Sequence, residues 1–542
     1  MLTLVRERVN LAQEYFDYVL VGAGSAGCAL ANRLSADPKR SVLLLEAGPR
    51  DLNPFLKIPA GISKIFVHKT LNWGYMTEPQ EQLESRRIYW PRGKTLGGSS
   101  AINGLIYVRG QSQDYDDWEA AGCSGWGWRD VLPVYKRLEH HEDGASEWHG
   151  GSGELHVTRA RYRHRASEMF LEACEAAGFP RTPDFNGASQ YGAGDYQFTI
   201  RNGFRASSAS AFLGPAKRRP NLHMLTNTQA ERIVFEGKQA TGLVVNHHGE
   251  SRTIGANEVI LCAGALNSPQ LLMLSGVGPA DHLREHGIDV VHDLPGVGQN
   301  LHDHTLVQHQ AETAPDLSIN RQMRGIRLVP QVIRYLANRK GLLTIGASQL
   351  AAFLKSDEAL TRPNIQLMFK PYTIEMSPDK KIVPGARPGW TTAASPLRPT
   401  SRGWLKLRSA DWRDAPAMQP NFLDTAEDRA LMVAGIRIMR RVFAHPPLAD
   451  VARETLPGGD LQSDEDLLAF ARSNTNSVYH PVGTCRMGMG DEAVVDPSLR
   501  VRGMTNLRVV DASIMPSIVS GNTNAASIMI GAKAGESIRA EI

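Results

Sequence analysis

Three glycines near the N-terminus, Gly22, Gly24 and Gly27, have the G-x-G-x-x-G spacing of a dinucleotide-binding turn. The first glycine of such a turn permits a sharp bend, the second lets a pyrophosphate approach the backbone, and the third lets a helix pack against a strand. The N–H groups at the start of that helix, from Ser25 on, face the phosphates. Glu46 follows about twenty residues later, where an acidic residue binds the ribose of a dinucleotide.

The residues on either side of these positions predict the strands and the helix that would hold them. The apolar run 16–21 predicts a strand before the glycine turn, and a helix is expected to begin at Ser25. The run 41–45 predicts a second strand that ends at Glu46. Three glycines in an apolar stretch are also typical of a close-packed turn, but the strand, the helix and the acid together favour a nucleotide site. The motif leaves open whether the dinucleotide is NAD or FAD.

A second glycine-rich stretch spans 93–104 and carries interleaved hydroxyl and amide side chains. Its backbone can approach a flat or anionic ligand, and Ser99, Ser100 and Asn103 offer hydrogen bonds. Taken alone, the stretch is equally typical of a flexible turn.

The length, composition and net charge are those of a globular protein of several domains. Its 542 residues predict two or three domains, and its net charge of +4 comes with no Lys/Arg run that would indicate a nucleic-acid partner. No apolar run is long enough to span a membrane, and residues 1–15 carry acids as well as arginines, unlike a cleavable signal. The five cysteines lack metal spacing and are interpreted as reduced thiols of a cytoplasmic protein.

The rest of the chain shows patterns that predict further helices, strands and loops. Residues 114–137 predict packed helix, and 139–153, with His140, His141 and His149, predict an exposed loop rather than a metal site. Residues 221–245 predict antiparallel strands, and 258–265 a buried strand. Residues 303–472 are interpreted as a substrate-side layer.

Four segments together resemble the glucose–methanol–choline (GMC) family of flavin oxidoreductases, closest to its bacterial alcohol and choline dehydrogenase branch. They are spread over nearly the whole chain in the family's order: the first glycine turn with Glu46-Ala47-Gly48, 93–103, 264–278, and 480–524.

The resemblance implies an α/β fold with a Rossmann-type FAD-binding domain assembled from discontinuous segments, beside an α+β substrate-binding domain with an antiparallel sheet. The FAD-binding parts are expected at 14–155, 222–305 and 490–542, and the substrate-binding parts at 156–221 and 306–489.

The resemblance also implies which residues contact FAD. Gly22, Gly24 and Ser25 would hold the pyrophosphate, Glu46 the adenosine ribose, and Ala230 the adenine end. The flavin and its ribityl chain, including the ribityl phosphate, would lie along Arg92, Gly97, Gly98, Asn103, Ile106, Asp511, Ala512 and Asn524. Further cofactor contacts are expected at Ala26, Ala47, Ser99, Gly104, Ala263, Gly264, Tyr479, Asn522 and Thr523, and no metal is expected. Isoleucine stands at position 102, where some oxidases of the family attach FAD through a histidine, so FAD should be bound non-covalently.

His480 matches the catalytic histidine of the family, and Asn522 matches its second active-site position. A neutral imidazole suits removal of a hydroxyl proton while hydride leaves the alcohol carbon for flavin N5. Asn522 would donate a hydrogen bond to the developing alkoxide. Tyr479 is interpreted as pocket wall or as packing.

The predicted function is therefore oxidation of a primary alcohol to an aldehyde, with electrons passed to a quinone or other acceptor. The alternatives are an oxidase that reduces O2 to H2O2, an FAD-containing lyase such as a hydroxynitrile lyase, and a non-catalytic flavoprotein. Choline as substrate would call for an aromatic cage and a carboxylate between Leu306 and Pro399. Peripheral contact with the inner face of a membrane is compatible with the sequence, and the oligomeric state is left open.

Overall fold

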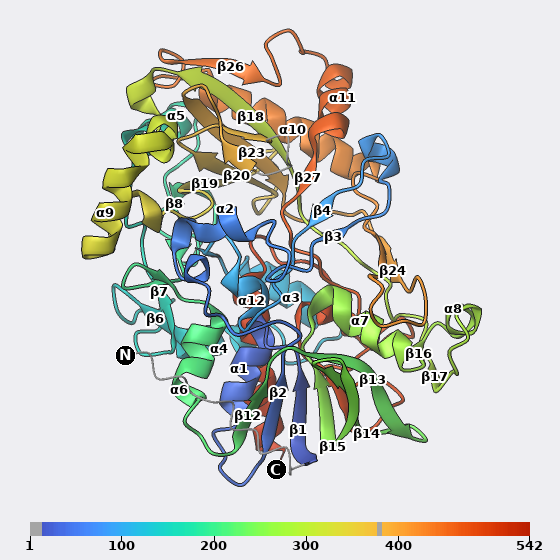
Figure 1. The fold of residues 1–542 in the computed structure, drawn as a ribbon. Coiled ribbons are helices and arrows are strands. Elements are labelled where there is room, and N and C mark those ends of the chain that lie inside the picture. Colours follow the sequence, from blue (N-terminus) through green and yellow to red (C-terminus); the bar gives the residue numbers. More distant parts are fainter. Residues whose placement is uncertain (1–13, 377–381, 542) are drawn as a thin grey trace.

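The computed structural model describes residues 14–376 and 382–541, apart from the side chains of Met376 and Ile382. The segment expected to lack a signal peptide, 1–15, lies almost entirely outside the described residues. Two seven-stranded sheets dominate the fold, one in the lower and one in the upper half of Figure 1.

The lower sheet has the strand order β12-β2-β1-β15-β14-β13, and β28 also pairs with β15. Its strands are β1 (Tyr15–Val21), β2 (Val42–Leu45), β12 (Leu222–Leu225), β13 (Thr228–Glu236), β14 (Gln239–His247), β15 (Glu250–Leu261) and β28 (Leu507–Val509). The pairings of β12, β2, β1, β15 and β28 are parallel, whereas β13, β14 and β15 form an antiparallel meander. The antiparallel prediction for 221–245 is therefore right for β13 and β14 and wrong for β12, because an apolar run predicts a strand without naming its partner.

The parallel register aligns the ends of the strands that matter. Val21 lies opposite Leu45 on one side and Leu261 on the other, so Gly22, Glu46 and Cys262 emerge at the same edge. Ligands of open α/β sheets bind at this carboxyl edge. The sheet combines blue, green and red segments in Figure 1, which shows that the Rossmann-type domain is assembled from discontinuous parts of the chain.

The upper sheet is antiparallel throughout, in the order β26-β18-β23-β20-β19-β8, with β27 also paired to β18. Its strands are β8 (Gly192–Asp195), β18 (Thr305–Thr313), β19 (Leu350–Leu354), β20 (Ile365–Lys370), β23 (Gly389–Pro396), β26 (Ala452–Leu456) and β27 (Asn476–Ser477). This is the predicted antiparallel sheet of the second domain. The residue boundaries predicted between the two domains stay predictions.

Short strands pair outside the two sheets: β3 (Tyr75–Met76) with β4 (Tyr89–Trp90), β5 (Ile106–Tyr107) with β9 (Gln197–Phe198), β6 (Glu139–His141) with β7 (Leu155–Val157), β10 (Ile200–Arg201) with β11 (Phe204–Arg205), β16 (Val277–Gly278) with β17 (His292–Asp293), β21 (Ile374–Met376) with β22 (Ile382–Pro384), and β24 (Trp404–Lys406) with β25 (Ala417–Gln419).

The α-helices described are α1 (Ser25–Leu34), α2 (Ile62–Ile65), α3 (Ser112–Ala120), α4 (Trp128–Leu138), α5 (Arg165–Ala176), α6 (Gly214–Ala216), α7 (Gly264–Leu274), α8 (Ala280–Glu285), α9 (Leu328–Asn338), α10 (Ala426–Phe443), α11 (Asp464–Asn474) and α12 (Asn524–Ala540). α3 and α4 account for the helix predicted at 114–137. Helix α10 packs on β23 and α5 on β20, so helices cover the upper sheet.

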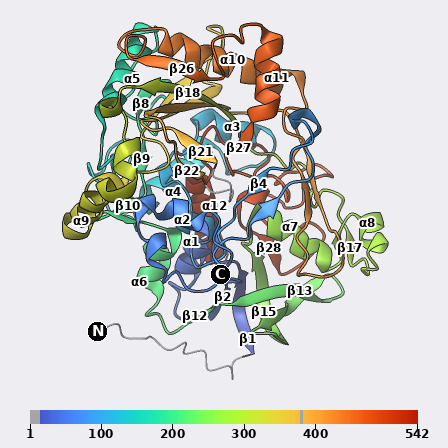
Figure 2. The ribbon, with the colours of Figure 1, turned by 45° about the horizontal axis from the view of Figure 1, so that its top comes forward.

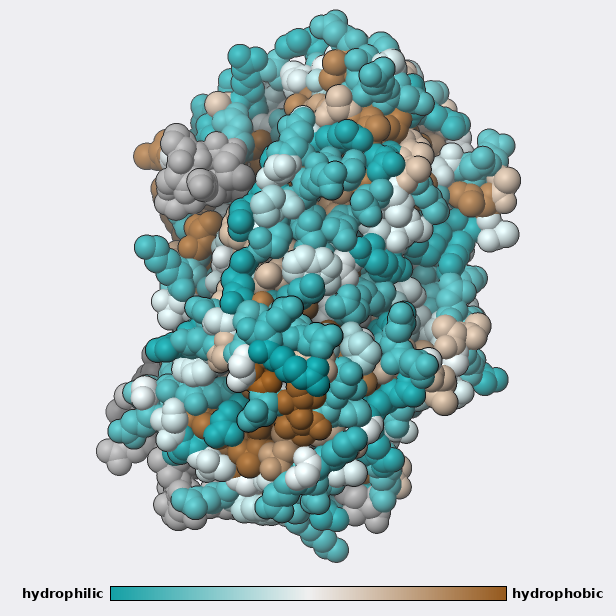
Figure 3. Space-filling view, turned by 90° about the vertical axis from the view of Figure 1, so that its right-hand side faces the viewer, coloured by the Kyte–Doolittle hydropathy of each residue, from teal (hydrophilic) through white to brown (hydrophobic). Residues whose placement is uncertain are grey.

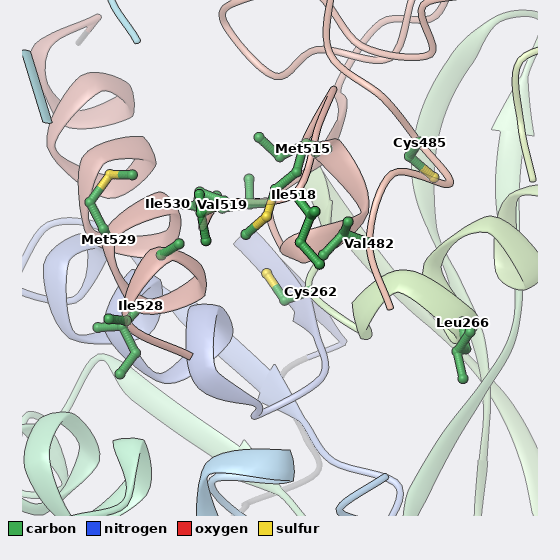
Figure 4. Packing of buried hydrophobic residues seen from close by; sticks show 14 of the residues in the cluster. Cys262, Leu266, Val482, Cys485, Met515, Ile518, Val519, Ile528, Met529 and Ile530 are labelled. Atoms are coloured by element: carbon green, nitrogen blue, oxygen red, sulfur yellow. The ribbon is translucent and has the colours of Figure 1, made fainter. Parts of the chain in front are cut away.

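The first and last helices pack tightly against each other. A Cβ atom on Gly531 would lie 2.2 Å from the carbonyl oxygen of Ala26, so only glycine permits this approach. Ile528, Met529 and Ile530 of α12 and Cys262 at the end of β15 belong to the same buried cluster (Figure 4). The five cysteines are buried and form no disulfide among the described residues, as predicted.

The segment 139–153, predicted to be an exposed loop, is exposed only in part: residues 142, 143 and 145–147 are exposed, whereas Glu139 lies in β6 and is buried, as are His141 and His149. Glu139, His141 and His149 have 0, 5 and 5% of their surface exposed. Arg109 donates to Glu139 at 2.5 Å, and His149 lies 2.9 Å from Glu139 and 2.6 Å from Asp184. Burial alone would lower the pKa of His149, but its bonds to Asp184 and Glu139 raise it to about 9. The sequence pattern could not show this compensation, because Arg109 and Asp184 are distant in the chain.

The molecular surface seen in Figure 3 is mostly hydrophilic, and its largest gathering of hydrophobic side chains lies at the height of the lower sheet. Among the described residues, no helix combines the length and the apolar character needed to cross a bilayer.

Candidate active site

A single cavity collects the residues that the sequence predicts for cofactor binding and catalysis. It begins at the carboxyl edge of the lower sheet and extends to the upper sheet, where Leu306 and Met368 line it. The predicted residues on its wall are Gly22, Gly24, Ser25, Ala26, Glu46, Ala47, Arg92, Gly98, Ser99, Asn103, Gly104, Ile106, Ala230, Ala263, Gly264, Tyr479, His480, Asp511, Ala512, Asn522, Thr523 and Asn524.

Gly97 is the exception, because it does not line the cavity. It has a left-handed φ of 92°, and its N–H donates to the carbonyl oxygen of Ala23 at 2.8 Å. The next residue, Gly98, sits so close to the first glycine turn that a Cβ on it would lie 2.7 Å from the Cα of Gly24. Gly97 therefore joins the two glycine-rich segments, and its predicted contact with the cofactor stays a prediction.

Two helices begin at the phosphate end of the cavity. The hydroxyl of Ser25, the first residue of α1, donates to Oδ1 of Asn524, the first residue of α12, at 2.8 Å across 499 residues of chain. The first N–H groups of a helix have no partner within it and carry the positive end of its dipole. The start of α1 thus offers donors where a pyrophosphate would bind, and the start of α12 offers donors beside it.

Glu46 is held rigidly at the end of β2. Its Oε2 accepts from the N–H of Ala23 at 3.1 Å and its Oε1 from the N–H of Gly48 at 2.9 Å. Burial raises its pKa to about 7, although these two N–H groups and Lys94 act in the opposite direction. Each carboxylate oxygen has a second lone pair, which leaves acceptors for ribose hydroxyls.

The open space fits a flavin dinucleotide. Gly264 has a left-handed φ of 84° and lines the cavity, and a Cβ placed on it would meet no atom within 4 Å. At the other end, Oδ1 of Asn522 is buried and has no hydrogen-bond partner among the described residues. A buried polar atom without a partner is costly unless a ligand supplies one.

A chain of three polar side chains forms the reactive end. Nε2 of His304 lies 2.8 Å from the carbonyl oxygen of Leu397, and Nδ1 of His304 lies 3.0 Å from Nδ1 of His480. Nε2 of His480 lies 3.1 Å from Nδ2 of Asn522. The backbone N–H of His480 donates to Oδ1 of Asp303 at 2.6 Å, which fixes where the histidine stands.

This chain determines the tautomers of both histidines. A carbonyl oxygen only accepts, so His304 carries its proton on Nε2 and, when neutral, accepts at Nδ1. His480 must then donate from Nδ1, which leaves its Nε2 unprotonated and accepting from the amide of Asn522. The imidazole of His480 thus presents a lone pair at the cavity wall.

Both imidazoles are held neutral. Burial lowers the pKa of His480 well below its ordinary value, and His304 and Arg92 add to this effect. Burial likewise lowers the pKa of His304 to about 4, opposed by its bond to Leu397. Near neutral pH, His480 is therefore ready to accept a proton rather than already charged.

Several residues of this site were not predicted from the sequence. Asp303 and His304 support His480, and the segment Asn300–His304, with its two histidines, was the available signal. Other unpredicted lining residues include Thr228, Cys262, Asn267, Gln270, Lys370 and Trp412. These are ordinary residues of strands, helices and loops, and only the fold shows that they meet one cavity.

The described residues between Leu306 and Pro399 do not provide the cavity with the aromatic cage and carboxylate that choline would require. Of the described residues between Leu306 and Pro399, those that line the cavity are Leu306, Ala347, Ser348, Met368 and Lys370. None is aromatic or acidic.

Comparison with known proteins agrees with the geometry of the site. Residues 16–306 match the N-terminal domain of GMC oxidoreductases, and residues 399–531 match the C-terminal domain. The chain is 46% identical over 532 residues to an alcohol dehydrogenase [acceptor] of Pseudomonas putida, which covers 96% of this chain and 95% of the relative. It is 42% identical to the mitochondrial choline dehydrogenase of Homo sapiens, over 98% of this chain and 91% of that protein.

Solved structures give the same result. Pyridoxine 4-oxidase from Mesorbium loti superposes with a TM-score of 0.87 at 33% identity and covers 97% of this chain and 99% of that chain. Formate oxidase from Aspergillus oryzae superposes with a TM-score of 0.91 at 28% identity and covers 97% of this chain and 98% of that chain. The chain therefore belongs to the GMC oxidoreductase family and binds FAD.

Proposed function

We propose that this enzyme oxidises a primary alcohol to an aldehyde, with His480 as the general base. FAD-dependent alcohol oxidation with an electron acceptor follows from the family and its relatives; the assignment of roles to residues is the proposal. The observation that carries it is the chain Leu397–His304–His480–Asn522, which leaves Nε2 of His480 unprotonated, with only the amide of Asn522 bonded to it.

The chemistry divides between cofactor and protein. When bound, FAD supplies the acceptor for the hydride of the alcohol carbon. His480 takes the hydroxyl proton at Nε2, and the positive charge that results is shared with His304 through the Nδ1–H bond. Nδ2 of Asn522 can turn from His480 to the substrate oxygen as that oxygen gains negative charge.

The cofactor is proposed to lie along the predicted residues. Glu46 would bind the adenosine ribose, the N-terminus of α1 the pyrophosphate, and Gly98, Asn103 and Ala512 the flavin side of the cavity. Asn524, at the N-terminus of α12, would lie by the flavin pyrimidine. The positions of Glu46 and His480 support this orientation of FAD. Glu46 lies at the carboxyl edge of the lower sheet, whereas His480 lies beside the upper sheet, at the other end of the cavity.

The test of the proposed reaction is anaerobic mixing of the purified holoenzyme with primary alcohols of several classes. Loss of the oxidised flavin absorbance, with one aldehyde formed per flavin, is expected. Absence of bleaching by every alcohol, with release of an aldehyde and cyanide from a cyanohydrin, would instead support the lyase. Bleaching followed by peroxide formation at the rate of dye reduction on admitting air would identify an oxidase.

We also propose that the acceptor is met at an anionic membrane surface, to which α9 docks. Four large apolar side chains on and just before this helix face solvent: Ile326, Val329, Ile333 and Leu336 are 86, 49, 60 and 62% exposed. Their spacing places them along one side of a helix. Helix α9 lies at the outer edge of the molecule in both ribbon views (Figures 1 and 2).

The charge around this stripe favours an anionic partner. No Asp or Glu occurs between residues 317 and 341, whereas six cations do: Arg321, Arg324, Arg327, Arg334, Arg339 and Lys340. An apolar stripe flanked by arginines is typical of helices that lie in the headgroup region of a bilayer. Each cation near such a surface contributes about 1 kcal/mol, and each buried apolar side chain about 1.5–3 kcal/mol.

The membrane contact is tested by flotation of the holoenzyme with vesicles of phosphatidylcholine alone or with 30% phosphatidylglycerol (about the charge density of an anionic leaflet). The enzyme should float with the anionic vesicles, less so at high salt, and the variant Ile333→Asp/Leu336→Asp should not. Met489→Asp, which changes an apolar side chain 65% exposed elsewhere, is the matched control. Equal flotation of all three proteins, or a dimer that the double variant breaks without any vesicle binding, would contradict the proposal.

A further inference from the structure

One charged side chain on the cavity wall has no task in the chemistry described so far. Lys370 is the last residue of β20, a strand between β19 and β23 in the upper sheet. Met368 and Lys370 both line the cavity, as alternate residues on one face of a strand should. Lys370 therefore enters the cavity from the substrate-side domain and not from the sheet that carries the phosphate turn.

The ammonium group of Lys370 has no hydrogen bond or ion pair among the described residues. The carboxylates that line the same cavity are Glu46 and Asp511. Glu46 is held by the backbone amides of Ala23 and Gly48, and Asp511 accepts from the N–H of Gly264 at 2.8 Å and the hydroxyl of Ser268 at 2.6 Å. Both belong to the lower sheet and its cofactor edge, so neither neutralises Lys370.

Such an arrangement is costly without a ligand. An ammonium group partly removed from water is stabilised by a partner or loses its proton more readily, and desolvation lowers the pKa of the partly exposed Lys370 to about 8. By contrast, the fully buried Arg109 is paired with Glu139. A partly exposed cation on a cavity wall that no carboxylate of the protein neutralises can bind an anionic group of a ligand that enters the cavity.

We propose that Lys370 binds an anionic group of the substrate, so that the preferred alcohol carries a carboxylate at the end remote from its hydroxyl. This inference rests on the proposed alcohol oxidation at His480. The apolar side chains of Leu306 and Met368 line the same part of the cavity and suit an apolar spacer between hydroxyl and carboxylate.

The same residue argues against a quaternary ammonium substrate. A choline-type cation would meet the like charge of Lys370, and the described lining residues of the upper sheet offer it neither an aromatic ring nor a carboxylate.

Two matched substrate pairs test the inference: 4-(hydroxymethyl)benzoate against 4-methylbenzyl alcohol, and 6-hydroxyhexanoate against 1-hexanol. For the wild-type holoenzyme, kcat/KM should be at least tenfold higher for the anionic member of at least one pair. Lys370→Met should lower kcat/KM for that member by about ten- to hundredfold, mainly through KM, and change the neutral member less than threefold. Lys370→Arg should retain most of the preference.

Lys355→Met is the matched control. Lys355 directly follows β19, the strand beside β20, but it stands at the other end of that pairing and does not line the cavity. Its removal changes the net charge equally and should leave both substrate preferences unchanged. An equal loss with Lys355→Met would mean that the effect is one of overall charge and would overturn the inference.

A measurement without turnover separates this inference from the proposed function. 4-Methylbenzoate carries the anion but no hydroxyl, and its binding is read from the perturbation of the flavin spectrum. Wild type should bind it at least tenfold more tightly than Lys370→Met, even if no alcohol were oxidised. Equal affinities, or a variant that slows both members of each pair alike while shifting the flavin potential, would show that Lys370 acts on the flavin and not on the substrate.

Discussion

His304 and His480 share one hydrogen bond between their Nδ1 atoms, 3.0 Å apart, and the carbonyl of Leu397 decides which of them donates. Because His304 gives its only proton to that carbonyl, His480 is oriented with its basic nitrogen toward Asn522 and the cavity. The position of His304 thus converts a histidine with two equivalent tautomers into a base with one.

Replacement of His304 by Ala should therefore change the pH profile as well as the rate. We expect kcat to fall about ten- to hundredfold, because a small misplacement of a reacting group can cost about 10²-fold in rate. His304 helps to lower the pKa of His480, so its loss should raise that pKa. Because only neutral His480 accepts a proton, kcat/KM falls as pH drops through the pKa, and this fall should begin at higher pH in the variant. Anaerobic flavin reduction between pH 5 and 9 measures it.

His302→Ala is the control for this experiment. His302 is also buried, but its Nδ1 faces the carbonyl of Asn300 at 2.6 Å rather than His480. Its replacement should leave the acid limb unchanged. An identical shift in both variants would mean that packing, and not the shared proton, sets the behaviour of His480.

Gly264 and Gly287 form a matched pair for testing the cofactor cavity. Both have a left-handed φ, 84° and 68°, and a Cβ on either would meet no atom within 4 Å. Alanine at either position should cost about 1–2 kcal/mol of unfolding free energy. Only Gly264 lines the cavity, so only Gly264→Ala should weaken FAD binding, by at least tenfold in a titration of the apoprotein. Equal FAD affinity in the two variants would show that FAD does not occupy this space.

The side chain at position 102 makes a further prediction about the cofactor. Ile102 lines the cavity and has no atom that can form a bond to the flavin. Precipitation with acid should release all of the yellow colour into the supernatant, where mass spectrometry should find unmodified FAD. Flavin that stays with the washed precipitate would contradict non-covalent binding.

Local patterns predicted the parts of the site that depend on neighbouring residues. The turn at Gly22 and the acid at Glu46 are each defined by a strand that ends beside them, so spacing was enough. The same logic fails for contacts across the chain. Lys370 has no distinctive pattern, because lysine is common at the ends of strands. The residues next to it in the sequence do not show that this face of β20 lines the cavity. The roles of His480 and Asn522 came from resemblance, because a histidine before a proline has no distinctive local pattern.

Burial was the other property that sequence patterns misjudged. Charged and histidine-rich residues between 139 and 153 predicted exposure, yet Glu139 is fully buried with Arg109 and His149 as partners. The cost of burying a charge depends on the groups that compensate it, and these came from distant segments. The antiparallel pairing predicted for β12 was wrong for a related reason, because its parallel partner β2 lies far earlier in the chain.

The most direct test of the central claim is anaerobic reduction of the flavin by a primary alcohol in wild type and in His480→Ala, with FAD content measured in both. The claim predicts equal FAD content, rapid bleaching in wild type, and a rate in His480→Ala lower by at least the 10²–10⁴-fold that a general base supplies. Bleaching of the variant at a rate near that of wild type would contradict it.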